Sequence, residues 1–321
     1  MMKKLILVLA ILALSVACQK DSKIEEEIAK IDVNFKVERF DRQFATAQPN
    51  DLPRLKATFP FLFSERVDDS VWINRMKDTL QQSLFTEVDK TFGDFSEVTK
   101  DITSLFQHLK YYDKIFTEPR VITLTNFVDY RNKTIVTDTI DLVALDNYLG
   151  KDHKFYTDIP RYLAQNMRPP QIVCDLAADY AEKYISQLQR KTLLDDMIYF
   201  GKQLYFKDKV IPFETDAEKI GYTQKQLDWA ISNESYIWRY FIEKELLYST
   251  DSSLPNRFIA PAPFSKFYLE LDSDSPGRLG QYMGWQIVRS YMEHNDVGLM
   301  DMLKKDATEI FNDAKFKPRK E

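Results

Sequence analysis

The stretch IVCDLAADYA, residues 172–181, combines a cysteine, an acidic residue and the spacing found in zinc-hydrolase helices. Cys174 is followed by Asp175, and Ala178 stands four residues after the cysteine. In the motif H-E-x-x-H, two imidazoles one helical turn apart bind zinc, and the glutamate acts as general base. A cysteine thiolate could replace the first histidine, but alanine at the second position has no donor atom. The sequence therefore predicts no functional zinc site in this helix.

The same stretch has the periodicity of a helix with one apolar face. At 100° per residue, Cys174, Ala178 and Ala181 fall close to one line, and Asp175 lies on another face. Free cysteine is among the most frequently buried residue types. We therefore interpret Cys174 as a small buried thiol in a core helix. A catalytic pairing with His153 is the alternative, although no G-x-S-x-G motif supports nucleophilic catalysis elsewhere in the chain.

The other cysteine, Cys18, ends the segment LILVLAILALSVAC, which follows Lys3 and Lys4. This apolar run is shorter than the roughly 18 residues that span a bilayer, so it indicates a signal peptide over residues 1–17. Small residues before the cysteine are typical of a bacterial lipobox. We predict acylation of Cys18, including palmitate, and a lipidated tether over residues 18–31. The lipid would anchor the protein in the cell envelope, on the periplasmic side or at the outer-membrane surface.

The composition excludes several classes of protein. The chain has 321 residues, only 8 glycines and a net charge of −5. There is no basic patch to bind nucleic acid, and neither a P-loop nor a G-x-G-x-x-G motif is present, so we expect no nucleic-acid partner and no cofactor. If Cys18 is acylated, Cys174 has no intrachain partner, and a disulfide framework is excluded.

The apolar periodicity predicts an α+β protein in which residues 32–321 form one domain. Alternating residues over 33–37 predict a strand, and the segments 120–130 and 134–145, rich in Val, Ile and Thr, predict an antiparallel hairpin. The half of the chain after residue 170 is predominantly helical and accompanies this small antiparallel sheet. Expected helices cover 71–93, 96–116, 171–189, 192–206, 224–248, 277–294 and 302–313.

The expected helix over 224–248 contains a cluster of aromatic residues. They are Trp229, Tyr236, Trp238, Tyr240 and Phe241. Such a cluster can form the wall of a sugar- or peptide-binding site, but it more often belongs to a core helix. We favour the core interpretation and keep a carbohydrate-binding protein as a third functional hypothesis.

Several long stretches, in order along the chain, resemble the gliding-motility lipoprotein GldB family. They are FKVERFDRQF, DNYLG, IGYTQKQLDWAISNESYIW, RFIAPAPFSKF and DSPGRLGQYMGWQIVRSYM. The resemblance spans nearly the whole chain after Cys18. It implies an envelope lipoprotein needed for gliding, with protein partners in a motility apparatus coupled to a dedicated outer-membrane secretion system. Since the family implies no established catalytic residue, the resemblance favours a non-catalytic component.

This family in turn resembles a zinc-peptidase-like family that carries H-E-x-x-H. In that resemblance Cys174, Asp175 and Ala178 stand for the first His, the Glu and the second His, and Phe200 stands for the third metal ligand. The implied fold is a zincin-like scaffold with lost ligands, a pseudo-enzyme without metal. The alternative function is a lipid-anchored hydrolase similar to zinc metallopeptidases.

Overall fold

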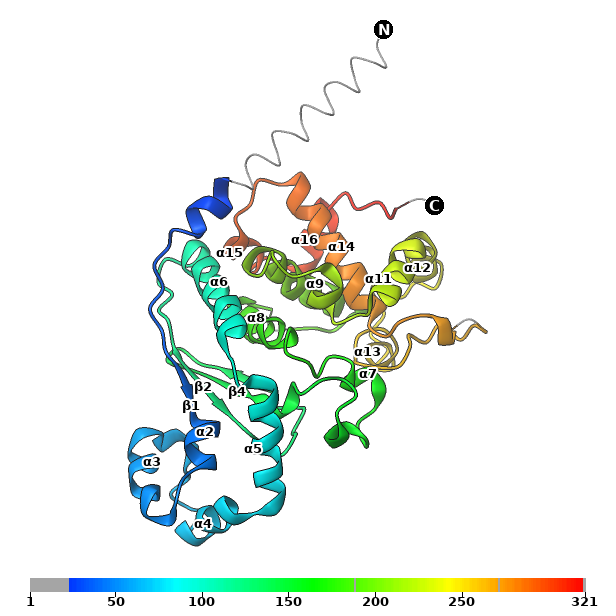
Figure 1. Ribbon diagram of the computed structural model, residues 1–321. Coiled ribbons are helices and arrows are strands. Elements are labelled where there is room, and N and C mark those ends of the chain that lie inside the picture. Colours follow the sequence, from blue (N-terminus) through cyan, green and yellow to red (C-terminus); the bar gives the residue numbers. More distant parts are fainter. Residues whose placement is uncertain (1–22, 188, 271, 320–321) are drawn as a thin grey trace.

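The computed structural model describes residues 23–187, 189–270 and 272–319, and it has the α+β fold that the periodicity predicts. The predicted signal peptide and Cys18 lie outside these described residues. Figure 1 shows a small sheet at the centre, a group of helices from the first hundred residues at one end, and a larger helical stack at the other.

The sheet has four strands in the order β1-β2-β4-β3, which are Val37–Arg39, Arg120–Leu124, Ile140–Ala144 and Thr134–Val136. β2 pairs in parallel with both β1 and β4, and only β3 and β4 are antiparallel. The predicted hairpin between 120–130 and 134–145 is therefore wrong in its pairing, because the hairpin lies within the second segment. Val121, Ile122 and Thr123 are all buried in β2, as expected for a parallel strand covered on both faces.

Most of the helices that precede β2 form a second, smaller core around Phe44 and Phe59, whereas the last of them, Ser96–Tyr112, belongs to the larger core. The predicted helix over 71–93 is two helices, because the Asp78 side chain accepts a hydrogen bond from Gln81 N and caps the second one. The apolar spacing continues across this break and conceals it. The helices are α2 (Phe40–Ala45), α3 (Leu52–Thr58), α4 (Asp69–Lys77), α5 (Thr79–Phe92) and α6 (Ser96–Tyr112).

The larger core lies in the helical second half of the chain. Its longer helices are α8 (Gln171–Tyr184), α9 (Leu193–Val210), α11 (Gln224–Ser232), α12 (Glu234–Glu243) and α14 (Leu279–His294). The shorter ones are α7 (Arg161–Ala164), α10 (Asp216–Ile220), α13 (Leu254–Phe258), α15 (Leu299–Met302) and α16 (Ala307–Asp313). Short 3₁₀ turns cover Pro49–Asp51, Pro60–Leu62, Leu145–Asn147, Lys154–Tyr156 and Asp272–Asp274.

The backbones of α9 and α14 touch where they cross. A Cβ atom on Gly201 would lie 2.4 Å from the carbonyl carbon of Gly284, and a Cβ on Gly284 would lie 1.8 Å from the carbonyl oxygen of Met197. Only glycine fits at such a crossing. This contact fixes the start of α14 relative to α8 and α9, and these three helices surround the site described below.

The described part of the predicted tether packs on the domain. Ile28 is buried, and Gln107 Nε2 of α6 donates a hydrogen bond to the carbonyl oxygen of Ile31 at 3.0 Å. The Nε2 atom of His108 lies 3.1 Å from Glu25 Oε2. The chain is therefore docked against α6 from about residue 25 onward.

Candidate functional site

A cavity of about 320 Å³ opens where α8, α9, α10 and the start of α14 meet. Asp175 and Ala178 of α8 and Phe200 of α9 all line it. The structure thus brings together three of the four positions that the zinc-peptidase resemblance selects. The fourth, Cys174, is absent from the wall of the cavity.

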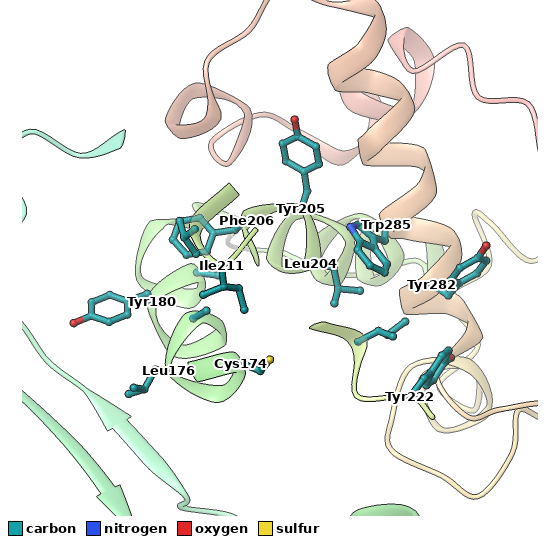
Figure 2. Close-up of a cluster of buried hydrophobic side chains, with 14 of the residues drawn as sticks. Cys174, Leu176, Tyr180, Leu204, Tyr205, Phe206, Ile211, Tyr222, Tyr282 and Trp285 are labelled. Atoms are coloured by element: carbon teal, nitrogen blue, oxygen red, sulfur yellow. The ribbon is translucent and has the colours of Figure 1, made fainter. Parts of the chain in front are cut away.

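The Cys174 thiol lies in the core. Its side chain is 0 % exposed, and Figure 2 shows the sulfur on the side of α8 that faces Leu204, whereas Leu176 and Tyr180 point the other way. Burial raises the pKa of the Cys174 thiol to about 12, so the reactive thiolate is not available at neutral pH. His153, considered as its partner, lies beside Glu87, with Nε2 3.4 Å from the carboxylate oxygen.

The position of Ala178 differs from the prediction. The sequence placed Ala178 on the buried line with Cys174, but its side chain is partly exposed and faces the cavity beside Asp175. The covered face of α8 instead holds Cys174, Ala177 and Ala181, each 0 % exposed. Apolar residues occupy a wide part of the circumference of α8, so periodicity alone does not locate the boundary between its core face and its cavity face. Alanine is small enough to lie on either face.

The residues at these positions do not fit a zinc ion. Ala178 and Phe200 have no donor atoms. The Asp175 carboxylate accepts hydrogen bonds from Lys133 Nζ and, at 2.8 Å, from the Tyr148 hydroxyl. Throughout the described ranges, no three His, Cys, Asp or Glu side chains are grouped so that they could hold a metal. The position of the general base is occupied by a carboxylate that is already ion-paired.

Cations dominate the wall of the cavity. Lys207 of α9 is only 8 % exposed, and its Nζ donates a hydrogen bond to the carbonyl oxygen of Lys219 at 3.0 Å. The Arg278 guanidinium donates to the Gly221 carbonyl oxygen at 2.9 Å and lies 5.4 Å from the centre of the Tyr222 ring. Burial lowers the pKa of both Lys207 and Arg278. Within the described residues, neither side chain has a carboxylate within salt-bridge distance.

Gly221, the residue that ends α10, organises one wall. Its carbonyl oxygen accepts hydrogen bonds from Gln165 Nε2 at 3.1 Å and Asn166 Nδ2 at 3.0 Å in addition to Arg278. Its φ is +70°, and an added Cβ would lie 2.6 Å from Asn166 Nδ2. A glycine is required here, and it holds two amides and a guanidinium in fixed positions.

Comparison of the whole chain with known proteins gives the family. The family model described as "Gliding motility protein GldB" matches residues 21–318. The chain belongs to this family. It is therefore a lipoprotein related to gliding motility and associated with the cell envelope. No curated protein and no solved structure matches the chain.

The chemistry of this GldB-family cavity was largely missed in the sequence. Lys133, Gly221 and Arg278 come from distant segments and carry no local motif. Lys207 does leave a signal, because Phe200, Leu204 and Lys207 share one helical face and all line the cavity. A lysine on the apolar stripe of a buried helix is an indication of a polar site that periodicity could have found.

No described helix is long and apolar enough to cross a membrane.

The aromatic cluster is divided between core and surface. The expected helix over 224–248 is broken at Asn233 into α11 and α12. Phe241 is fully buried, and Trp238 packs on Phe316 with ring centroids 5.2 Å apart. Trp229, Tyr236 and Tyr240 instead line a separate groove of about 440 Å³. The core interpretation therefore holds for only part of the cluster.

Proposed function

We propose that this protein is a lipid-anchored, non-catalytic binding component of the gliding machinery, which acts with the motility apparatus and its outer-membrane secretion system. One observation carries the proposal. The cavity beside the helix that the zinc-peptidase resemblance selects is lined by Lys133, Lys207 and Arg278 together with side-chain amides. Cations and amides recognise charged and hydrogen-bonding groups without changing covalent bonds.

The surroundings of Asp175 and Cys174 support binding over catalysis. A general base needs a free acceptor within reach of the substrate, and a nucleophile needs activation by a neighbouring base. Asp175 is occupied by Lys133 and Tyr148, and Cys174 is buried with a raised pKa. Neither group is prepared for a proton transfer or a covalent step.

The position of the chain start supports a role close to a membrane surface. The described chain is docked on α6 through Ile28 and Gln107. If Cys18 carries the lipid, only four residues separate it from Lys23, and an extended chain over these five steps spans at most about 18 Å. Such an anchor holds the domain next to the bilayer and limits its partners to proteins or chains at that surface.

Deletion of the gene tests this role. Spreading on agar should be abolished while growth in liquid culture stays normal, and normal spreading by the mutant would contradict the proposal.

Cys18→Ala should release the protein from membranes or block its maturation. Crosslinking in living cells, followed by identification of the captured proteins, should recover components of the motility or secretion apparatus.

A lipid-anchored zinc hydrolase is the second candidate, because Asp175, Ala178 and Phe200 line one cavity as in an active site. Its test is metal analysis of the purified full chain together with a peptidase assay. Stoichiometric zinc with hydrolysis would replace the binding function by the enzymatic one.

A further inference from the structure

The cavity contains two cations that form no ion pair with a carboxylate of the described residues, although Asp175 acts on both from a longer distance. Lys133 is paired with Asp175, and Lys219, which also lines the wall, donates to Asp208 Oδ1 at 3.2 Å. Lys207 and Arg278 remain, and each has only a backbone carbonyl as its hydrogen-bond acceptor. A buried cation without a counter-charge is costly in free energy, so an anion bound between the two would stabilise the site.

The backbone at Arg278 adds a second, independent observation. Its φ is +62°, in the left-handed region that a non-glycine residue rarely adopts, immediately before the first residue of α14. Strained backbone of this kind is concentrated at functional sites, where it orients a side chain. Here it directs the guanidinium to Gly221 at the cavity wall from the N-cap position of a 16-residue helix, whose positive end also favours an anion.

The neighbouring amides specify the kind of anion. Asn166 and Gln281 line the cavity, and their amide nitrogens already donate to the carbonyl oxygens of Gly221 and Ile259, at 3.0 and 2.8 Å. Each of these nitrogens keeps a second N–H group, and the two amide oxygens accept no hydrogen bond from the described residues, so they are open to N–H donors of a ligand. An anion that fits has N–H donors close to its charge. A peptide chain that ends in a free carboxylate has such N–H groups beside its charge, whereas the donors of inorganic phosphate are O–H groups of the charged group itself.

We propose that this cavity binds the C-terminal carboxylate of a peptide, with Lys207 and Arg278 contacting the carboxylate and the amides of Asn166 and Gln281 contacting the main chain. The planar fork of an arginine matches the two oxygens of a carboxylate. The proposal rests on the proposed function as a binding component and names its ligand class. The ligand is either a free oligopeptide or the C-terminal tail of a protein, because both present the same group.

Isothermal titration calorimetry of the full chain, purified in detergent, tests this assignment. The probes are acetyl-Ala-Ala-Ala with a free carboxylate, the same peptide as its C-terminal amide, and inorganic phosphate. The free acid should bind, and the amide should bind at least roughly tenfold more weakly, the loss expected for one charge-assisted contact. No binding of the free acid, equal binding of acid and amide, or binding of phosphate alone would overturn the proposal.

Two variants and a matched control accompany the titration. Lys207→Met and Arg278→Gln should each weaken binding of the free acid by roughly tenfold or more. Lys202→Met, which removes another buried lysine of α9 outside the cavity, should leave the affinity unchanged. Unchanged affinity in both cavity variants, each shown to be folded by circular dichroism, would also contradict the assignment.

A further titration distinguishes a free oligopeptide from the tail of a protein. Its probe is a folded carrier protein that ends in the same three residues. Binding of the carrier indicates a protein tail, and binding of the tripeptide alone indicates a free oligopeptide. The two proposals fail separately. If no peptide binds but the deletion mutant does not spread, this inference is wrong and the motility function stands.

Discussion

Lys202 and Lys207 lie five residues apart on α9, and burial lowers the pKa of both, yet their hydrogen-bond partners and charged neighbours differ. Lys202 Nζ donates to the carbonyl oxygens of Lys305 and Leu303, at 2.6 and 3.3 Å, and the nearby carboxylates of Asp306 and Glu309 favour its charge. Lys207 has one carbonyl acceptor. Burial lowers its pKa, the Asp175 carboxylate opposes this, and the cations of Arg278 and Lys133 lower the pKa further.

This difference separates a structural lysine from one held for a ligand. Lys202 fastens the segment around residues 303–305 to the central helix. Lys207 donates to a single carbonyl oxygen, and burial disfavours its charge while no carboxylate of the described residues is in ion-pair contact with it. Residues that lower the stability of the free protein are expected where function requires them. Three of the four predictions below test this comparison, and the fourth concerns a buried carboxyl group for contrast.

Both lysines depend on the close crossing of α9 with α14, so Gly284→Ala should affect the two sites together. The added Cβ has no room beside the Met197 carbonyl. The free energy of unfolding should fall by about 3 kcal/mol or more, as expected for overpacking against backbone. Urea denaturation followed by circular dichroism measures this loss. A change below about 1 kcal/mol would show that the crossing does not hold the site.

Asp141 of β4 is a buried charge that pH can remove, unlike the cavity cations. Burial raises its pKa to about 7, although the Tyr180 hydroxyl donates to it at 2.8 Å. This pKa is above that of Asp141 in the unfolded chain, so the folded protein holds the proton more tightly. The resulting stabilisation of the folded state is fully present below pH 4 and is lost as pH rises to 7. The loss is up to about 4 kcal/mol.

Asp141→Asn should remove that part of the pH dependence. Thermal unfolding of the native protein and the variant, measured at pH 5 and pH 8, gives the comparison. The native protein should lose more stability than the variant between the two pH values. Parallel losses in both proteins would assign the pH dependence to other groups.

Lys202→Met should destabilise the protein. The carbonyl oxygens of Lys305 and Leu303 would lose their donor in a buried place, at a cost of about 2 kcal/mol. Chemical denaturation measures the difference. An unchanged free energy of unfolding would remove the contrast on which the comparison depends.

Lys207→Met should have the smallest effect and the opposite sign. The variant loses one hydrogen bond but also removes a buried cation that has no ion-pair partner, and the second effect is larger. The free energy of unfolding of the ligand-free protein should therefore rise by about 1 kcal/mol. The melting temperature without ligand is the readout. A loss of about 2 kcal/mol or more would identify Lys207 as a structural residue like Lys202.

The sequence predicts the helices that build this site better than it predicts the site. Helical periodicity located α8, α9 and α14 to within a few residues, and the family resemblance agreed with the family model. The sequence could not show that Lys133, Lys207 and Arg278 face one cavity, because only tertiary packing brings such distant segments together. It also misplaced the partner of β2, since strand propensity does not specify which strand pairs with which.

Two errors at single residues have the same origin. Ala178 was assigned to the core because its size suits either a packed face or a cavity wall. Asp78 was placed inside a helix because the apolar spacing continues past it. In both cases a local pattern fits two arrangements, and contacts between distant elements decide between them.

The central claim is that a cationic binding cavity, without metal chemistry, serves gliding. The most direct measurement is spreading on agar by cells in which Lys207→Met replaces the native residue, with the protein quantified in the membrane fraction. The account predicts native levels of membrane-bound protein and spreading as poor as in the deletion mutant. Full spreading at native protein level would contradict it.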